Sequence, residues 1–287
     1  MINPLQILSK AFDELKKYKD TTFVIKCDGD LLEDPDLLKA FAEDVVMIKN
    51  AGINVIVVHD GSNIVNSMME KVSFKGNSAN LSTVDQASVE IVEMVLSGYV
   101  NKKIVSQINL AGGSAIGISG KDSHFMIARR SKIARYDTNL SDKVLNFGFL
   151  GELALMNPDI LLLLEESDII PVITPIAIGE DNRTYKIDSN DIAGAIAAVL
   201  SASKIVFITN SPGIEDENGD IISDVDIAKV TKMVTEEVKE TSLSGVLKAI
   251  FMSSEQNTEE AHIIDGRVPH SLMLELFTDN QNGTRVK

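Results

Sequence analysis

The chain has 287 residues, 44% of them hydrophobic and 24% charged, and a formal net charge of −15. This is the composition of an ordinary globular protein, long enough for one large α/β domain or two packed lobes. The acidic excess argues against nucleic acid or an anionic membrane surface as the main partner, since both bind through basic patches. The single cysteine, Cys27, excludes an internal disulfide and fits a reducing, cytoplasmic location.

The N-terminal stretch predicts an amphipathic helix over residues 3–19. Its apolar residues recur at helical spacing: Leu5, Leu8, Phe12 and Leu15. Charged residues between them exclude a signal peptide, which needs an uninterrupted apolar core. The apolar face of this helix requires a partner, either the body of the protein or another subunit.

Two strands in the first part of the chain are each followed by a small-residue turn. Residues 23–25 are an apolar run that ends at Lys26 and meets the turn Asp28-Gly29-Asp30. The β-branched run 53–58 leads through His59-Asp60-Gly61-Ser62 into a helical pattern. Strand, small turn and helix form phosphate-binding architecture, because N–H groups at a helix start point at anions. Here, however, two aspartates stand where phosphate would lie.

The later segments alternate between helix and strand signals. Helices are expected over residues 34–52, 62–69, 87–113 and 188–202, strands within 114–134 and 204–214, a helix end followed by a buried strand within 160–176, and hairpins at 177–187 and 215–225. The apolar stretch 158–179 is interrupted by charges and prolines, so we expect no membrane span. Alternating strands and helices predict a mainly parallel sheet covered on both faces.

Several longer segments are nearly identical in sequence to segments of one protein family, and they occur in the same order. They are "EIVEMVLSGYVNKKIVSQIN", "AGGSAIGISGKD", "FGFLGE" and "AHIIDGRVPHSLMLELFT". From about Leu5 to Thr284 the chain resembles the amino-acid kinase family and, within it, the N-acetylglutamate kinases of arginine biosynthesis. The resemblance implies an α/β fold, a three-layer αβα sandwich with a mainly parallel central sheet. It also implies transfer of the γ-phosphoryl group of ATP, as the Mg²⁺ complex, to the side-chain carboxylate of N-acetyl-L-glutamate, with no tightly bound cofactor or metal.

The resemblance also suggests how the chain is organised. Residues 1–20 would form an N-terminal oligomerisation helix, residues 21–201 a lobe of the acetylglutamate-binding type, and residues 202–287 a lobe of the nucleotide-binding type. The first helix and the C-terminal "HSLMLELFT" are similar to the arginine-inhibited branch, whose hexamers interlock through that helix. We therefore expect a homo-oligomer, either a dimer or a hexamer, and an arginine site in the C-terminal lobe.

The family's two catalytic lysines fall on Lys26 and Lys248. Positive charge is what phosphoryl transfer requires, because little covalent chemistry is left to the protein. Asn190 stands where the family has an aspartate that organises the two lysines, with Asp188 and Asp191 beside it. On the alternative interpretation these polar residues only cap the helix that follows.

The other site residues implied by the resemblance form four groups. The groups are phosphate loops at Asp28, Gly29, Asp60, Gly61 and Ser62, substrate-binding residues Leu81, Ser82 and Lys186, nucleotide-binding residues Thr209, Asn210 and Gly213, and effector residues His270, Glu275 and Gly283. Ser82 stands in place of an arginine that grips the substrate carboxylate, and Lys186 in place of an asparagine. Lys186 is therefore a candidate for the lost positive charge. For the effector group, the alternative is simple helix packing.

Three hypotheses about activity remain open. The first is a working N-acetylglutamate kinase in which Mg-ATP screens Asp28 and Asp60. The second is a catalytically impaired member, a pseudoenzyme that serves as a regulatory or arginine-binding subunit; it explains why the substitutions gather around both substrates. The third is a kinase for another acceptor, held by Lys186. The site residues favour the second hypothesis, and the family as a whole favours the first.

Overall fold

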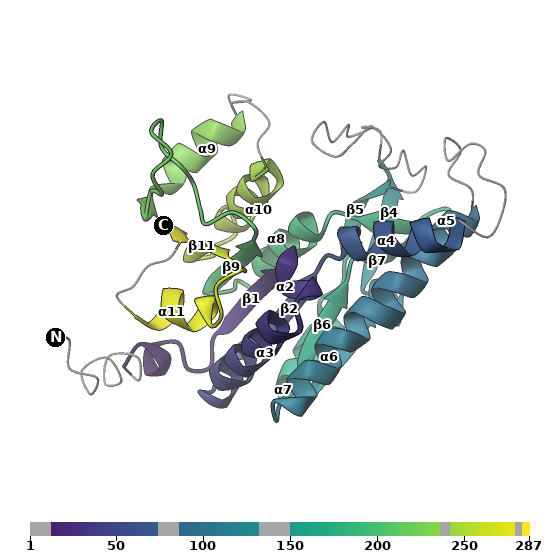
Figure 1. The fold of residues 1–287 in the computed structure, drawn as a ribbon, viewed down its shortest axis with the longest axis horizontal. Coiled ribbons are helices and arrows are strands. Elements are labelled where there is room, and N and C mark those ends of the chain that lie inside the picture. The colour runs from purple at the N-terminus through teal and green to yellow at the C-terminus, as the bar shows by residue number, and fades with distance from the viewer. Residues whose placement is uncertain (1–12, 74–85, 132–149, 236–241, 279–282) are drawn as a thin grey trace.

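The computed structural model describes residues 13–73, 86–131, 150–235, 242–278 and 283–287 (Figure 1). The α-helices are α2 (Asp30–Glu33), α3 (Pro35–Asn50), α4 (Ser62–Ser73), α5 (Gln86–Glu93), α6 (Asn101–Leu110), α7 (Asp159–Glu166), α8 (Ser189–Val199), α9 (Ile227–Thr235), α10 (Ser244–Ser254) and α11 (Ser271–Phe277). The strands are β1 (Thr22–Cys27), β2 (Asn54–His59), β3 (Ala115–Ser119), β4 (Met126–Arg130), β5 (Leu150–Met156), β6 (Ile170–Thr174), β7 (Ile176–Gly179), β8 (Thr184–Ile187), β9 (Lys204–Thr209), β10 (Asp224–Val225), β11 (Glu260–Asp265) and β12 (Gly283–Val286).

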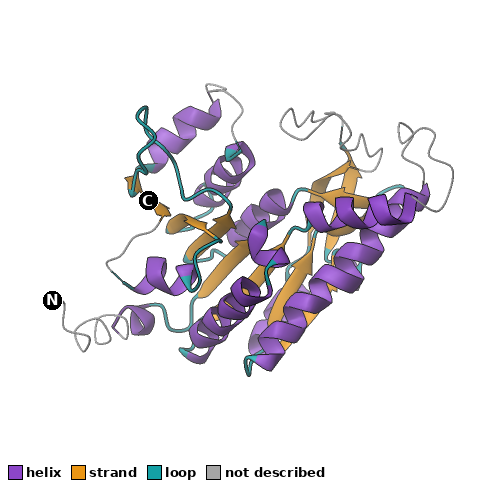
Figure 2. Cartoon of the chain, viewed as in Figure 1, coloured by secondary structure: helices purple, strands orange, loops and turns teal. Residues whose placement is uncertain are grey.

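The main sheet has eight strands in the order β10-β12-β11-β9-β1-β2-β6-β3. Every neighbouring pair in it is parallel except β11 and β12. A second sheet closes on itself in the order β4-β5-β8-β7 and stands at one end of the main sheet (Figure 2). The mainly parallel sheet predicted from the sequence is therefore confirmed.

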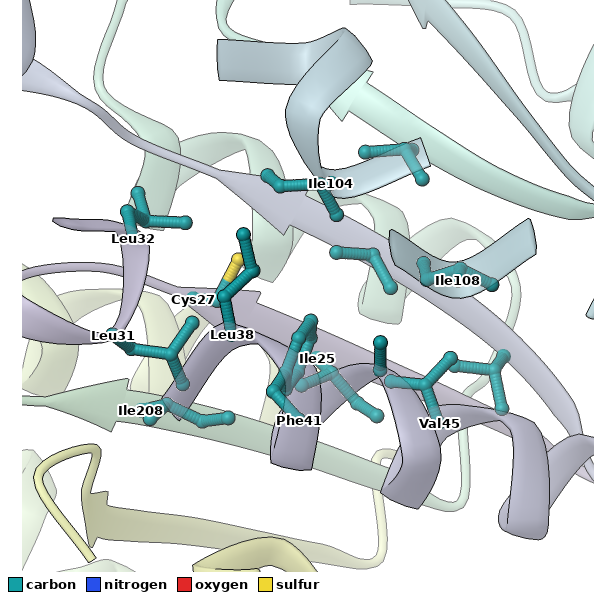
Figure 3. Close-up of a cluster of buried hydrophobic side chains, with 14 of the residues drawn as sticks. Ile25, Cys27, Leu31, Leu32, Leu38, Phe41, Val45, Ile104, Ile108 and Ile208 are labelled. Atoms are coloured by element: carbon teal, nitrogen blue, oxygen red, sulfur yellow. The ribbon is translucent and has the colours of Figure 1, made fainter. Parts of the chain in front are cut away.

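Helices cover both faces of the main sheet, because alternate residues of each central strand point to opposite sides. Ile25 and Cys27 of β1 belong to a core cluster that includes Phe41 of α3 and Ile104 of α6 (Figure 3). Val24, the residue before Ile25, belongs to the other cluster, which α8 and α10 complete. The result is the expected three-layer αβα sandwich.

The long helix expected over residues 87–113 is present, but its middle part has unusual geometry. A π-helical segment, Met94–Val100, joins α5 to α6. Such segments are rare and frequently lie at functional sites. Leu96 and Val100, two of its buried residues, lie against the turn at Gly61.

The two predicted hairpins differ in outcome. Strands β7 and β8 pair in antiparallel fashion, as expected for residues 177–187. In the 215–225 segment only Glu215 and Ile221 form an antiparallel bridge, with Gly219 at φ +86° near the tip, and β10 then pairs with β12. Strand β5 was not anticipated, because "LGELALM" lacks a clear alternation of apolar and polar residues.

The N-terminal helix predicted over residues 3–19 lies partly outside the described residues, and residues 13–17 are helical. No helix among the described residues combines the length and the apolar character needed to cross a bilayer.

Candidate active site

Three turns meet at one edge of the main sheet. Cys27, the last residue of β1, is in register with His59 of β2 and with Ile208 of β9. Because these strands are parallel and adjacent, the loops that follow them lie side by side. Ligands of open α/β sheets bind in the crevice outside the carboxyl ends of the strands, which is where these loops lie.

A cleft of about 770 Å³ opens at this edge. Its lining brings together most of the predicted site residues: Lys26, Asp28, Gly29, Asp60, Gly61, Ser62, Lys186, Asp188, Asn190, Thr209, Asn210 and Lys248. Gly213 lies apart from this lining, where an added Cβ would crowd Thr284. Leu81 and Ser82 are outside the described residues.

Lys26 is buried at the end of β1 and forms an ion pair with Asp28. Its Nζ lies 2.6 Å from Asp28 Oδ2, and the lysine side chain is only 2% exposed. Burial alone would lower the pKa of Lys26, but the carboxylates of Asp28, Asp60 and Asp188 outweigh that effect and raise it. Lys26 therefore remains an ammonium, and its charge is partly neutralised by Asp28.

Asp60 and Lys186 form a second ion pair inside the cleft. Lys186 Nζ lies 3.3 Å from Asp60 Oδ1 and donates a hydrogen bond of 3.1 Å to Ser62 Oγ. The Ser62 hydroxyl lies within 2.9 Å of Asp60 Oδ2. Burial opposes the charged form of Asp60, but Lys186 and Lys26 prevail and lower the pKa of Asp60 to about 2. Lys186 stands in place of a neutral family residue and adds a positive charge to the cleft. The negative charge of Asp60 balances it within the ion pair.

The start of α8 supplies the third group of charged and polar residues. Asp188 is the N-cap, and its side chain accepts a hydrogen bond from the backbone N–H of Asn190, so the capping interpretation is confirmed for this residue. Asp191 pairs with Lys248, with Nζ to Oδ1 at 3.2 Å. Asn190 Oδ1 is buried without a hydrogen-bond partner among the described residues. Asp191, rather than Asn190, therefore anchors the second lysine.

Asn210 links the end of β9 to the turn after β1. Its Oδ1 accepts from the backbone N–H of Asp30 at 3.0 Å, and its Nδ2 donates to Asp30 Oδ1 at 3.1 Å. Gly29, between the two loops, has φ +62°, and a Cβ there would overlap the Asn210 side chain. Only glycine fits this close approach.

A second cavity of about 390 Å³ lies between the N-terminal segment and the end of the sheet. Its lining includes the charged residues Glu14, Lys17, Lys204, Glu260, Glu275 and Arg285, and also His262. Glu275 is fully buried and accepts from His262 Nδ1 at 2.9 Å. His262, whose Nε2 lies 3.6 Å from Glu260 Oε2, and Lys204, which donates a hydrogen bond to Glu260, hold the pKa of Glu260 well below its usual range.

Of the three predicted effector residues, only Glu275 lines this cavity. His270 lies apart from it and pairs with the buried Asp44 of α3, with Nδ1 to Oδ1 at 2.7 Å. Gly283 begins β12 and packs against the backbone of Ile263.

Sequence reasoning did not identify Lys204, Glu260 and Arg285 as partners in one cavity, because they come from three different strands. It also missed Asn101, which is 1% exposed and hydrogen-bonded beneath the cleft. One signal was available, since Asn101 shares the helical spacing of the buried Ile104 and Ile108. A polar residue on such an apolar face calls for a buried partner.

Among the described residues, no group of three or more His, Cys, Asp and Glu side chains is arranged to hold a metal ion. Three carboxylates of the cleft are instead paired with lysines: Asp28 with Lys26, Asp60 with Lys186, and Asp191 with Lys248.

Comparison with known proteins gives a consistent result. The model of the amino acid kinase family matches residues 21–265. An acetylglutamate kinase from Ehrlichia canis (strain Jake) is 40% identical over 287 residues, covering 99% of this chain and 89% of the relative. One from Azoarcus sp. (strain BH72) is 36% identical over 283 residues, covering 98% of this chain and 94% of the relative.

Solved structures agree in fold. An N-acetylglutamate synthase from Neisseria gonorrhoeae, complexed with coenzyme A and N-acetyl-glutamate, superposes with a TM-score of 0.80 at 18% identity. The match covers 99% of this chain and 63% of that longer chain. A carbamate kinase from Giardia lamblia bound to AMP-PNP gives a TM-score of 0.66 at 10% identity, covering 93% of this chain and 98% of that chain.

Proposed function

Because the chain belongs to the amino acid kinase family and is 36–40% identical to relatives named acetylglutamate kinase, we propose that it phosphorylates N-acetyl-L-glutamate. The γ-phosphoryl group of ATP passes to the side-chain carboxylate of the acceptor, which gives an acyl phosphate and ADP. This is the phosphorylation step of arginine biosynthesis. Nothing in the comparisons favours the non-catalytic alternative.

The observation that carries the proposal is the presence of two lysines on one cleft at the carboxyl ends of the strands. Lys26 comes from β1 and Lys248 from α10, and both line the cavity. Phosphoryl transfer is catalysed mainly by positioning and by positive charge placed where negative charge develops. We assign Lys26 and Lys248 to this role, with Asp191 orienting Lys248 and with Gly29 and Gly61 allowing the phosphates to approach the backbone.

ATP must compete with Asp28 for Lys26. A carboxylate about 4 Å from a phosphate oxygen opposes it by about 4 kcal/mol at an effective dielectric constant of about 20, and by about 1 kcal/mol in bulk water. Asp28 is 36% exposed, so the lower figure is closer. We propose that Mg²⁺ enters with the phosphates of ATP and screens this carboxylate, and that Thr209 and Asn210 lie on the nucleotide side.

Lys186 is our candidate for holding the non-reacting carboxylate of the acceptor. Its side chain is 20% exposed at the cleft, and Ser62 and Asp60 fix its ammonium group. An ammonium can neutralise a substrate carboxylate in a cavity from which much of the water is excluded. Leu81 and Ser82 remain predicted neighbours of this subsite.

Trapping the acyl phosphate as its hydroxamate tests the proposal, with Lys248→Met compared with Lys229→Met. Lys229 is exposed on α9, away from the cleft. We expect Lys248→Met to lower kcat by about 10²- to 10³-fold, typical of losing one charge-stabilising donor, and Lys229→Met to match the unmodified protein. Equal activity of the two variants would refute the assigned role of Lys248.

The second cavity supports an additional proposal, binding of arginine as an effector. Glu260 and Glu275 supply negative charge for a guanidinium at this cavity, while Lys204 and Arg285 supply positive charge for a carboxylate. We expect L-arginine to raise the melting temperature and L-citrulline, which has nearly the same shape but no charged guanidinium, to leave it unchanged. Glu275→Gln should abolish the shift, and the exposed Glu217→Gln should retain it.

We further propose that residues 21–201 and 202–287 act as acceptor and nucleotide lobes, that the protein is cytoplasmic, and that it forms a dimer or hexamer through its N-terminal residues 1–20. Light scattering of the full chain and of a chain lacking residues 1–12 tests the oligomer. A hexamer built on this segment should become smaller, whereas an unchanged mass would refute its role.

A further inference from the structure

A buried polar group lies directly beneath the cleft and plays no part in the reaction proposed above. It consists of His59 at the end of β2, Asn101 at the start of α6 and Thr174 at the end of β6. Their side chains are 0%, 1% and 1% exposed. Buried polar groups of this kind must be mutually hydrogen-bonded, and the pattern of their bonds fixes their orientation.

The contacts determine which ring nitrogen of His59 carries the proton. Nδ1 lies 2.6 Å from the carbonyl oxygen of Asp60, which can only accept, so Nδ1 must donate. Nε2 is therefore the acceptor, and its single lone pair is shared between Asn101 Nδ2 and Thr174 Oγ1, each 3.3 Å away. Burial lowers the pKa of His59 to about 4, so the ring is neutral, as this pattern requires.

Asn101 is itself held in one orientation. Its Nδ2 donates to the carbonyl of Val172 at 2.9 Å, and its Oδ1 accepts from Lys102 Nζ at 3.1 Å. The amide nitrogen is therefore directed toward His59 Nε2. This arrangement keeps the proton of His59 on the side of the cleft.

The turn that His59 contacts carries two residues of the site. Asp60 presents its carboxylate to Lys186, and Gly61 lines the cleft. Gly61 has φ +147°, with Leu96 and Val100 of the π-helical segment 3.1 Å from where a Cβ would stand. The backbone N–H of Asp60 donates to the carbonyl oxygen of Cys27 at 3.1 Å. The backbone of Asp60 is therefore held at its N–H by Cys27 and at its carbonyl oxygen by His59.

We propose that His59 is a positioning residue: through its Nδ1–H bond to the Asp60 carbonyl it holds the turn from which Asp60 directs Lys186 into the cleft. His59 itself touches no substrate. The inference rests on the proposed function only for its kinetic consequence, because the hydrogen bonds are a property of the protein without ligands.

Two substitutions separate the two sides of the ring. The amide nitrogen of His59→Asn falls near the position of Nδ1 and retains the bond to Asp60, whereas the amide of His59→Gln falls near Nε2 and retains the bonds to Asn101 and Thr174. Both remove the ring, so both should lower the free energy of unfolding by similar amounts. We expect kcat/KM for N-acetylglutamate to stay within about threefold of the unmodified protein in His59→Asn and to fall at least about tenfold in His59→Gln.

Equal kinetic losses in the two variants would overturn the proposal, since they would reflect packing alone, and so would full activity of His59→Gln. Nitrogen-15 NMR of the unmodified protein without ligands supplies a test that needs neither turnover nor a stable variant. We expect a protonated Nδ1 and an unprotonated Nε2 at neutral pH, and the opposite tautomer would overturn the proposal. An unmodified protein that forms no acyl phosphate would refute only the proposed function.

Discussion

Replacing Asp60 by asparagine tests the electrostatic account of the cleft. Lys186 and Lys26 lower the pKa of Asp60 from 3.8 to about 2 although burial opposes this. At about 1.4 kcal/mol per pKa unit, the shift corresponds to about 2 to 3 kcal/mol of stability. Because the pKa is lower in the folded state, this contribution is complete above about pH 4, the pKa of an unfolded aspartate, and is lost as the pH falls toward 2.

The assay is urea denaturation of the unmodified protein, Asp60→Asn and the control Glu217→Gln at several pH values from 5 to 8. We expect Asp60→Asn to lower the free energy of unfolding by about 2 to 3 kcal/mol throughout this range, and Glu217→Gln to change it by less than about 0.5 kcal/mol. Glu217 is exposed. Unchanged or increased stability of Asp60→Asn would refute the reasoning, because crowding of Asp60 with Asp28 and Asp188 would then outweigh its attraction to the lysines.

Two further predictions concern glycine geometry and a buried acid. Gly29→Ala and Gly219→Ala share a positive φ, but only the first brings a Cβ into the Asn210 side chain. Gly219→Ala should therefore cost about 1 kcal/mol, while Gly29→Ala should cost more and reduce activity; equal costs in urea denaturation would contradict the close approach. Burial raises the pKa of Asp44 to about 6 even though His270 opposes the shift, so its charged form destabilises the fold at neutral pH and the protein should gain stability as the pH falls from about 6 to 4. Asp44→Asn should be more stable than the unmodified protein at pH 7 and lose most of that advantage by about pH 4, and a constant difference between the two would refute this.

The local features of the site could be predicted from the sequence. A short apolar run followed by a small turn places Asp28 and Asp60 at the ends of adjacent parallel strands, and the structure brings both turns into one cleft. Helical spacing likewise located α3 and α8, and the structure has Asp34 and Asp188 as their N-caps. Each of these features is formed by residues that are close together in the sequence. The pattern of those residues is therefore enough to predict it.

The pairing of charges could not be predicted in the same way. That Lys186 meets Asp60, or that Asn210 bonds Asp30, depends on how distant strands and helices pack, and no local pattern encodes it. The π-helical segment is a further example, because "MVLSGYV" reads as ordinary helix containing a glycine. The segment packs against the turn at Gly61, which is distant in the sequence, and no local pattern encodes this contact.

The most direct test of the central claim is acyl phosphate formation by the purified protein with Mg-ATP and N-acetyl-L-glutamate, measured beside one of the relatives named acetylglutamate kinase. We expect turnover within about tenfold of that relative, a barrier difference of about 1.4 kcal/mol, and the aspartates of the cleft are then compatible with catalysis. No product above background, with the protein folded and ATP present, would contradict the account.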